Sequence, residues 1–204
     1  MDEAQEKMED ERMTLPRKLN LGCGKQHLEG YWNIDITSDV NPDAVVKPNF
    51  TDLPYPDNQF EEVYCSSVLP YIPVKYLEDM LHEACRVCSG VVIIRTTHFQ
   101  SGQSYEFYMK DTNHAVVQAE TIYHLDNEIM DNGGNYWMQH LQKYPDYFKV
   151  HSVRIELHAN NHGIVRFVER WVNKSFAHQK KYQRLFISRL FPPRCVVARI
   201  SKRR

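Results

Sequence analysis

One short segment near the start of the chain limits its possible folds more than any other. An apolar run at Lys18–Leu21 opens into the turn Gly22-Cys23-Gly24, and eleven residues after that turn a second short run ends on Asp35. Glycines let the backbone approach a ligand without a Cβ in the way, and a carboxylate can accept hydrogen bonds from ribose hydroxyls. This order suits a nucleoside held across the carboxyl ends of two parallel strands.

The composition is that of a single globular domain. The chain has 204 residues, of which 42% are hydrophobic and 25% charged, enough for one domain with a full core. No window approaches the ~18 uninterrupted apolar residues of a membrane span, and the acidic start is unlike a secretion signal. We therefore expect a cytoplasmic protein in which residues 1–15 form a flexible acidic leader and residues 16–204 form the domain.

The cysteines and histidines do not form a metal-binding pattern. Cys85 and Cys88 make a C-x-x-C, but no second pair completes a zinc site. His158 and His162 are four apart, yet the asparagines and glycine around them favour a turn over a metal-binding helix. We expect no metal, and we expect all five cysteines to be reduced core thiols. They are Cys23, Cys65, Cys85, Cys88 and Cys195.

The net charge of −1 conceals an asymmetry between the two ends. Met1 to Arg12 holds six acidic residues and two basic ones, whereas Arg170 to Arg204 holds eleven Lys or Arg and no acidic residue. The simplest interpretation is a solvated leader and a helix with one basic face. The alternative is a basic wall for an anionic acceptor, such as a phosphate-bearing glycan or RNA.

Apolar runs predict strands that alternate with helices. About ten residues separate the first two strands, so a loop or a very short helix must replace the usual crossover helix. A helix from Pro73 is indicated by apolar residues at i, i+3, i+4 and i+7, namely Leu77, Met80, Leu81 and Ala84. The predicted strands are 18–21, 31–36, 44–47, 62–65, 91–96 after a turn at Gly90, 149–157 and 195–200, and the predicted helices are 73–87 and 171–190.

This alternation predicts an α/β fold. We expect a Rossmann-like three-layer sandwich with a mostly parallel sheet, in which the two late strands pair with each other and the last strand is antiparallel. Residues 97–148 are aromatic-rich and polar, which indicates an insertion on the acceptor side of the domain.

Three segments resemble the class I S-adenosylmethionine-dependent methyltransferases, in particular the small type-11 enzymes. They are Leu19-Asn20-Leu21-Gly22-Cys23-Gly24, Tyr31-Trp32-Asn33-Ile34-Asp35-Ile36, and the stretch from Asp52-Leu53-Pro54-Tyr55 to Tyr64. With the strand after Gly90 they cover about the first hundred residues in the family's order. The resemblance implies S-adenosyl-L-methionine as the cofactor.

The resemblance also implies the residues that bind this cofactor. Gly22 and Gly24 would lie under its methionine part, and Asp35 would accept from the ribose hydroxyls. Asn20 stands where relatives often carry an acidic residue, so it brings no charge toward the cofactor's ammonium. The implied set is Asn20, Leu21, Gly22, Cys23, Gly24, Asp35, Ile36, Asp52, Leu53 and Ser66.

The rest of this set would surround the adenine and the sulfur. Ile36 would cover one face of the adenine, and Asp52 would accept from the adenine amino group with Leu53 beside it. Ser66, just past the fourth strand, would lie near the methyl-bearing sulfur.

A nicotinamide dehydrogenase is the rival nucleotide-binding interpretation. It requires a third glycine where this chain has His27, and a carboxylate about twenty residues further on. Both requirements fail, so the sequence disfavours it.

The chemistry depends on the acceptor. An oxygen or neutral nitrogen must lose a proton as the methyl group is transferred, which calls for a positioned base. Relatives often have a Glu-His pair after the fourth strand, but this chain has Pro70-Tyr71 there. The candidate catalytic residues are therefore His98, at the end of the fifth strand, and Asp111 and His114 in a segment that resembles D-P-T-H. For either histidine the alternative is a structural role.

These observations lead to one expected function and two alternatives. We expect a methyltransferase that O-methylates a small molecule or a glycan sugar under the insertion at 97–148. The first alternative is a catalytically inactive methyltransferase-like scaffold or subunit. The second is an RNA methyltransferase, because of the basic C-terminal region.

Overall fold

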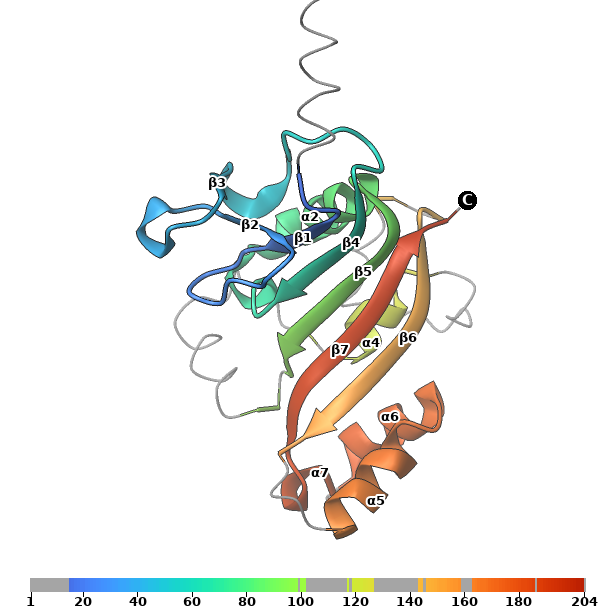
Figure 1. Ribbon diagram of the computed structural model, residues 1–204. Coiled ribbons are helices and arrows are strands. Elements are labelled where there is room, and N and C mark those ends of the chain that lie inside the picture. Colours follow the sequence, from blue (N-terminus) through green and yellow to red (C-terminus); the bar gives the residue numbers. More distant parts are fainter. Residues whose placement is uncertain are drawn as a thin grey trace, which may run out of the picture.

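A computed structural model gives the structure of most of the chain (Figure 1). It describes residues 15–98, 100–101, 117, 119–126, 143–144, 146–158, 163–185 and 187–203. The predicted leader, most of the predicted insertion, and the candidates Asp111 and His114 lie outside the described residues.

Seven strands form one sheet in the order β3-β2-β1-β4-β5-β7-β6 (Figure 1). Strands β1 to β5 are parallel, and β7 runs antiparallel between β5 and β6. The predicted α/β, Rossmann-like sheet with an antiparallel last strand is therefore confirmed. The strands are β1 (Lys18–Leu21), β2 (Trp32–Asp35), β3 (Ala44–Val45), β4 (Phe60–Ser66), β5 (Cys88–Thr97), β6 (Phe148–Leu157) and β7 (Pro193–Lys202).

The connection between β1 and β2 is a loop, as the short spacing predicts. Short 3-10 turns follow β2 and β3, and a third follows β4. They are η1 (Ser38–Val40), η2 (Pro48–Phe50) and η3 (Leu69–Tyr71). The edge of the sheet that carries β2 and β3 is thus built mainly from turns.

Gly90 lies inside β5, so the predicted turn at this residue is wrong. The strand begins at Cys88, three residues earlier than predicted. A Cβ on Gly90 would lie only 2.3 Å from the carbonyl oxygen of Glu61. The glycine lets β5 approach β4 closely beside the register shift between Phe60 and Glu62.

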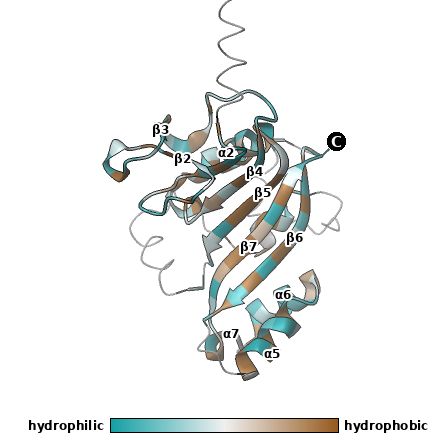
Figure 2. Ribbon diagram, viewed as in Figure 1, coloured by the Kyte–Doolittle hydropathy of each residue, from teal (hydrophilic) through white to brown (hydrophobic). Residues whose placement is uncertain are grey.

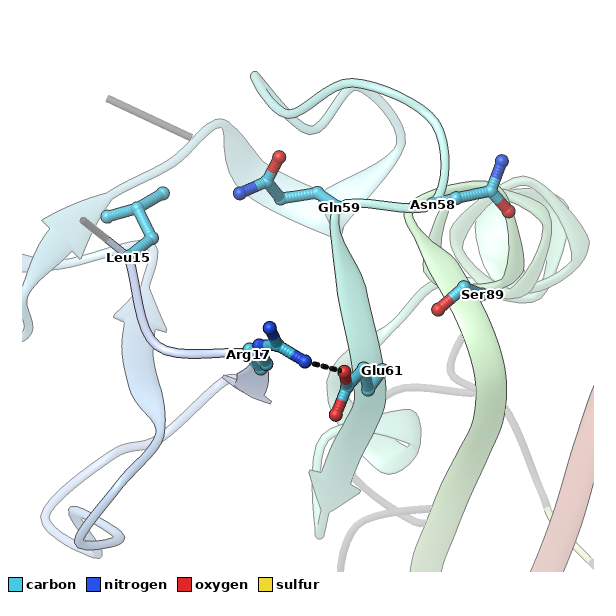
Figure 3. Close-up of a pocket in the computed structure, with 6 residues that line it drawn as sticks. All are labelled: Leu15, Arg17, Asn58, Gln59, Glu61 and Ser89. Carbon is cyan, nitrogen blue, oxygen red and sulfur yellow. Dashed lines mark hydrogen bonds and ion pairs between the residues drawn. The ribbon is translucent and has the colours of Figure 1, made fainter. Parts of the chain in front are cut away.

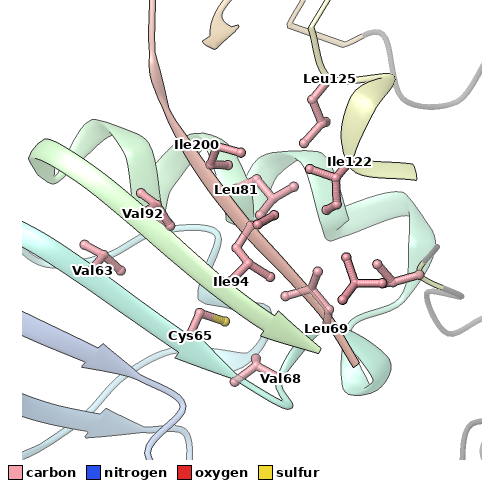
Figure 4. Close-up of a cluster of buried hydrophobic side chains, with 14 of the residues drawn as sticks. Val63, Cys65, Val68, Leu69, Leu81, Val92, Ile94, Ile122, Leu125 and Ile200 are labelled. Carbon is pink, nitrogen blue, oxygen red and sulfur yellow. The ribbon is translucent and has the colours of Figure 1, made fainter. Parts of the chain in front are cut away.

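One long helix covers the centre of the sheet. Helix α2 (Val74–Arg86) begins directly after Pro73, and its four predicted apolar residues are all buried. The short helix α4 (Ala119–Tyr123) adds Ile122 to the same core. Figure 4 shows Leu81 of α2 and Ile122 in the same buried cluster as Val92 and Ile94 of β5.

The predicted helix 171–190 is wrong as a single element. The structure has α5 (Gly163–Val172), α6 (Phe176–Arg184) and α7 (Ile187–Leu190) instead. Ser175 separates the first two, because its Oγ accepts a hydrogen bond from the backbone N–H of His178 and caps α6. Within the described ranges, no helix combines the length and apolar character needed to cross a bilayer.

Buried and exposed side chains largely alternate along the outer strand β6, and Figure 2 shows hydrophobic and hydrophilic residues following each other along it. Several of its outward backbone groups are bonded by the side chains of Asn173, directly after α5, and Gln179 on α6. The side chain of Asn173 both accepts from the N–H of Ile155 (2.8 Å) and donates to its carbonyl oxygen (2.9 Å). Gln179 donates to the carbonyl oxygen of Val153 at 2.8 Å. The edge of the sheet at β6 is therefore closed by the chain itself.

Candidate cofactor-binding site

The turn after β1 folds back onto β2. The backbone N–H groups of Gly22 and Cys23 both donate to the carbonyl oxygen of Ile34, each at 2.9 Å. Gly22 and Gly24 have φ angles of 70° and 50°, in the left-handed region that glycine tolerates. A Cβ on Gly22 would lie 2.3 Å from Val68, whereas one on Gly24 would meet no described residue within 4 Å. The turn is packed on one side and open over Gly24.

Asp35 lies at the end of β2, against this turn. Its Oδ2 accepts from the backbone N–H of Gly24 at 2.8 Å, and its Oδ1 accepts from the N–H of Ile36 at 2.7 Å. The residue is buried, and these two bonds fix the carboxylate in one orientation. Each oxygen keeps a lone pair for a further donor. The carboxylate can therefore accept from the two hydroxyls of a ribose placed over Gly24.

The connection between β1 and β2 is a loop and not a helix, and the side chains of two asparagines fix its conformation. Buried Asn20 donates from Nδ2 to the carbonyl oxygen of Gln26 and to Oδ1 of Asn33, both at 2.9 Å. Oδ1 of Asn33 also accepts from the N–H of Leu28 at 2.8 Å. Both N–H groups of Asn20 are thus used within the protein. Sequence reasoning missed Asn33, although its place opposite Asn20 on the neighbouring strand could have indicated the pair.

The residues expected around the adenine lie on two exposed turns. Ile36 follows Asp35 directly and is exposed although it is apolar. Asp52 is also exposed, and its ion pair with Lys47 lowers the pKa of its carboxyl below the ordinary value. Leu53 beside it is buried. An exposed isoleucine next to a carboxylate that is expected to accept from a ribose can cover one face of a base.

A charged pair on α2 holds the loop that carries Leu53. Arg86 binds both carboxylate oxygens of Glu83, at 2.7 and 2.8 Å, and donates to the carbonyl oxygens of Leu53 (3.0 Å) and Tyr55 (2.8 Å). Glu83 in turn accepts from the N–H of Leu53 at 3.0 Å. Burial alone would raise the pKa of Glu83, but the bonds from Arg86 and Leu53 lower it below the ordinary value. Sequence reasoning missed this pair, which appears in the sequence only as two charged residues three apart.

The end of β4 meets the glycine turn. Ser66 is the last residue of β4 and is half-buried, and Ser67 after it adopts a φ of 60° and donates to the carbonyl oxygen of Arg95 at 2.7 Å. Val68 then packs against Gly22. Ser66 is thereby placed at the same edge of the sheet as the turn and Asp35.

His98 lies just past β5 and is fully buried. Its Nδ1 accepts from the backbone N–H of Gln100 at 3.0 Å, and its Nε2 lies 3.0 Å from the side-chain amide of Gln183 on α6. The amide oxygen of Gln183 has no partner within the described residues. Turning that amide over would let it accept from the Nε2–H of His98. Burial lowers the pKa of His98 to about 4, so the ring is neutral at pH 7.

The burial of His98 predicts acid sensitivity. The unfolded chain takes up a proton near pH 6.5, but the folded chain does so only near pH 4. Stability from this residue is therefore complete above about pH 6.5 and is lost as the pH falls towards 4. Urea unfolding across this range should show a shallower pH dependence for His98→Gln than for the wild type.

The exposed His151 on β6 provides the matched control. His151→Gln should keep the wild-type pH dependence. If His98→Gln also kept it, the ring would not be held neutral in the folded protein.

The packing of Gly22 predicts a difference between the two glycines of the turn. Both alanine variants would strain a positive φ, but only Gly22→Ala would also displace Val68. We expect Gly22→Ala to lower the free energy of unfolding by about 1 kcal/mol more than Gly24→Ala. Urea unfolding of the two variants measures the difference. Equal losses would mean that Val68 moves aside without cost.

A cavity of about 420 Å³ lies elsewhere, at the amino ends of β1, β4 and β5. Figure 3 shows it with Arg17 and Glu61 joined by an ion pair at 2.6 Å. Ligands of open α/β sheets bind at the carboxyl ends of the strands. We therefore do not assign this cavity to the cofactor. Its lining residues are Leu15, Arg17, Asn58, Gln59, Glu61 and Ser89.

The five cysteines are buried free thiols, as predicted. Burial raises the pKa of Cys23 in the glycine turn to about 11, and the neighbouring Asp35 adds to this shift. Its thiol is therefore neutral beside the open side of the turn. Among the described residues, no group of three His, Cys, Asp or Glu side chains is arranged to hold a metal ion.

The strand order is that of a Rossmann-like α/β fold, and the glycine turn after β1 with the fixed carboxylate at the end of β2 forms a candidate nucleoside-binding edge. Residues 19–94 match the family model of a methyltransferase domain. The match spans 76 of the 204 residues and makes this part of the chain similar to methyltransferase domains. Among curated proteins, none matches it with significant sequence similarity.

Several solved structures share the fold. A SAM-dependent methyltransferase from Archaeoglobus fulgidus is 19% identical, with 98% of this chain and 92% of that chain covered and a TM-score of 0.52. The geranyl diphosphate C-methyltransferase of Streptomyces coelicolor A3(2), in complex with S-adenosyl-L-homocysteine, is 10% identical (98% and 80% covered, TM-score 0.51). The [4+2]-cyclase SpnF is 13% identical (98% and 80% covered, TM-score 0.50). At these identities the likeness concerns the fold alone.

S-adenosyl-L-methionine is the cofactor that the resemblance to methyltransferases implies, and the residues present would fit it. The open side of Gly24 leaves room for the ligand, and Asp35 is fixed beside it for the ribose. Exposed Ile36 follows Asp35 directly, where it could contact the adenine of the cofactor. When bound, the cofactor supplies a methyl group on a positively charged sulfur.

Proposed function

We propose that this enzyme methylates an oxygen atom of a small molecule or of a glycan sugar. The observation that carries the proposal is the fixed pairing of Asp35 with Gly24, at the carboxyl ends of the strands where β5 runs on toward the insertion. The proposed site comprises the ten cofactor-binding residues named from the sequence, with the acceptor held by residues of the insertion at about 97–148.

The returning end of this insertion is anchored on α2. The buried carboxylate of Glu78 accepts from the backbone N–H groups of Lys143 (2.9 Å) and Tyr144 (3.0 Å). The hydroxyl of Tyr144 donates to Asp79 at 2.7 Å, and its ring stacks on His82 with 4.2 Å between centroids. The insertion thus leaves the sheet at the end of β5 and returns to a fixed point on α2, which supports its role as an acceptor-holding segment.

Methyl transfer to a hydroxyl forms a carbon–oxygen bond, breaks the carbon–sulfur bond and releases a proton. The residues of the chain must orient the hydroxyl in line with the methyl group and take up this proton. His98 has both ring nitrogens engaged and a lowered pKa, so it would first have to give up a partner. We therefore favour His114, with Asp111 close to it in sequence, as the base, and keep His98 as the second candidate.

Two other functions remain as alternatives. The basic C-terminal region favours an RNA acceptor, because cations there would meet phosphates. A fold of this kind also occurs in a cyclase, so a chain that binds the cofactor without transferring its methyl group is the second alternative. We propose a cytoplasmic location, which is consistent with five unpaired thiols.

The test has two stages. Calorimetric titration with S-adenosylmethionine and S-adenosylhomocysteine measures binding, and labelled S-adenosylmethionine with fractionated cell extract measures transfer. We expect both compounds to bind, and the label to enter small molecules or glycans in an alkali-stable form. Label that nuclease releases would support the RNA alternative. Binding without transfer to any fraction would support the inactive scaffold.

A further inference from the structure

The helices α5, α6 and α7 gather at one end of the molecule, beyond β6 and β7 (Figure 1). Eight large apolar side chains are substantially exposed in the described part of the chain, and four of them lie in this region. Phe167 is 71% exposed, Leu190 63% and Ile164 62%. We call this region the α5–α7 surface. The fourth residue is Leu185.

Helix α5 is apolar on two sides. Val165, Val168 and Val172 are buried and attach the helix to the domain. Ile164 and Phe167 are three residues apart, so they share a second face that points to solvent. Folding of the described chain leaves this second face uncovered. Exposed apolar residues gathered on one surface usually mark an interaction site.

The segment of the chain that carries this surface is strongly basic. Residues 163–194 contain eight Lys or Arg and one acidic residue, Glu169. Glu169 already accepts from the N–H of Leu157 and lies 3.7 Å from Arg154. The cations are Arg166, Arg170, Lys174, Lys180, Lys181, Arg184, Arg189 and Arg194. A partner for this surface must be anionic and must also accept apolar side chains.

We propose that the α5–α7 surface binds an anionic lipid bilayer. Ile164, Phe167 and Leu190 enter the boundary between headgroups and acyl chains, and the surrounding cations bind the headgroups. A second copy of the chain would present the same positive charge and be repelled. RNA could stack a base on Phe167, but it would gain little from Ile164, Leu185 and Leu190, which offer no aromatic plane.

The α5–α7 surface lies at the same edge of the sheet as the candidate cofactor site. Strand β6 is antiparallel to β7, which is antiparallel to β5, so β6 ends at the same edge as the glycine turn. Helices α5 to α7 follow that end of β6 (Figure 1). Docking would therefore bring the cofactor site close to the bilayer, within reach of an acceptor carried at its surface.

Sedimentation of the full chain with lipid vesicles tests the proposal. The probes are vesicles of phosphatidylcholine alone and of phosphatidylcholine with about 30% phosphatidylserine. We expect binding at least about tenfold tighter to the anionic vesicles, weakening as salt is added. The double variant Ile164→Ser, Phe167→Ser should lose at least about tenfold in this binding. Val74→Ser, at an exposed valine on α2, should not.

Two double variants with the same change of net charge test whether the cations of the α5–α7 surface are needed for binding. Arg170→Glu combined with Lys174→Glu should weaken binding to the anionic vesicles at least about tenfold. Lys75→Glu combined with Lys149→Glu makes the same change of net charge outside this surface and should have a much smaller effect. Phe167→Trp leaves the surface intact, and its fluorescence should shift to shorter wavelength when anionic vesicles are added.

Three results would overturn the proposal. They are equal binding to both kinds of vesicle, unchanged vesicle binding by the α5 variants, and binding of a labelled oligoribonucleotide without binding of vesicles. Titration with S-adenosylhomocysteine shows in each case whether the variant is folded. The outcome does not depend on which acceptor the enzyme methylates.

Discussion

Replacement of Arg86 by alanine should lower the free energy of unfolding by about 3 kcal/mol. The change leaves the carboxylate of Glu83, whose side chain is only 12% exposed, without its counter-charge. It also leaves the carbonyl oxygens of Leu53 and Tyr55 without their donor. Removing one member of a mostly buried ion pair costs more than the pair contributes, because the remaining charge stays desolvated. Urea unfolding followed by circular dichroism measures the loss.

Arg17 provides a control of the same chemistry. It also pairs with a glutamate, Glu61, but the two side chains are 80% and 57% exposed. Arg17→Ala should therefore change the free energy of unfolding by less than about 0.5 kcal/mol. If Arg86→Ala cost no more than Arg17→Ala, the loop at Leu53 would be held by something other than α2.

Replacement of Asp35 by alanine should weaken the binding of S-adenosylhomocysteine at least about tenfold. The variant loses the proposed acceptor for the ribose hydroxyls, and it also loses the bonds that fix Gly24 and Ile36. Both effects act on the same ligand, one by contact and one through the shape of the turn. Isothermal titration calorimetry measures the change in affinity.

Asp39→Ala is the matched control, because Asp39 is a nearby exposed carboxylate of the same charge. Its affinity for S-adenosylhomocysteine should stay close to that of the wild type. Equal losses in the two variants would indicate a general effect of charge. An unchanged affinity in Asp35→Ala would mean that Asp35 does not hold the ribose.

The part of the fold that the sequence predicts well is the part determined by local pattern. Strand β1 is found at the predicted residues, because a short apolar run before a glycine turn has few other interpretations. Helix α2 is also found within one residue of its predicted ends, because proline starts it and its apolar residues recur with helical spacing. Asp35 was placed at a strand end for the same reason.

The differences arise where distant parts of the chain meet. Gly90 is in a strand because of the carbonyl oxygen of Glu61, which lies 29 residues earlier in the chain, and no local pattern contains that contact. The break after α5 accompanies the bonds of Asn173 to β6. His98 was singled out as a base from its place in the chain, but its partner Gln183 lies 85 residues away. Single-sequence reasoning identifies side chains at an edge but not what they bind there.

The side-chain bonds along β6 affect how the protein behaves in concentrated solution. An incoming strand would have to displace Asn173 and Gln179 before it could add to this ten-residue strand. Addition of strands from other molecules is the first step of fibril growth, and here its longest template is already occupied. We therefore expect folded copies of the chain to resist pairing edge to edge along β6 even at high concentration.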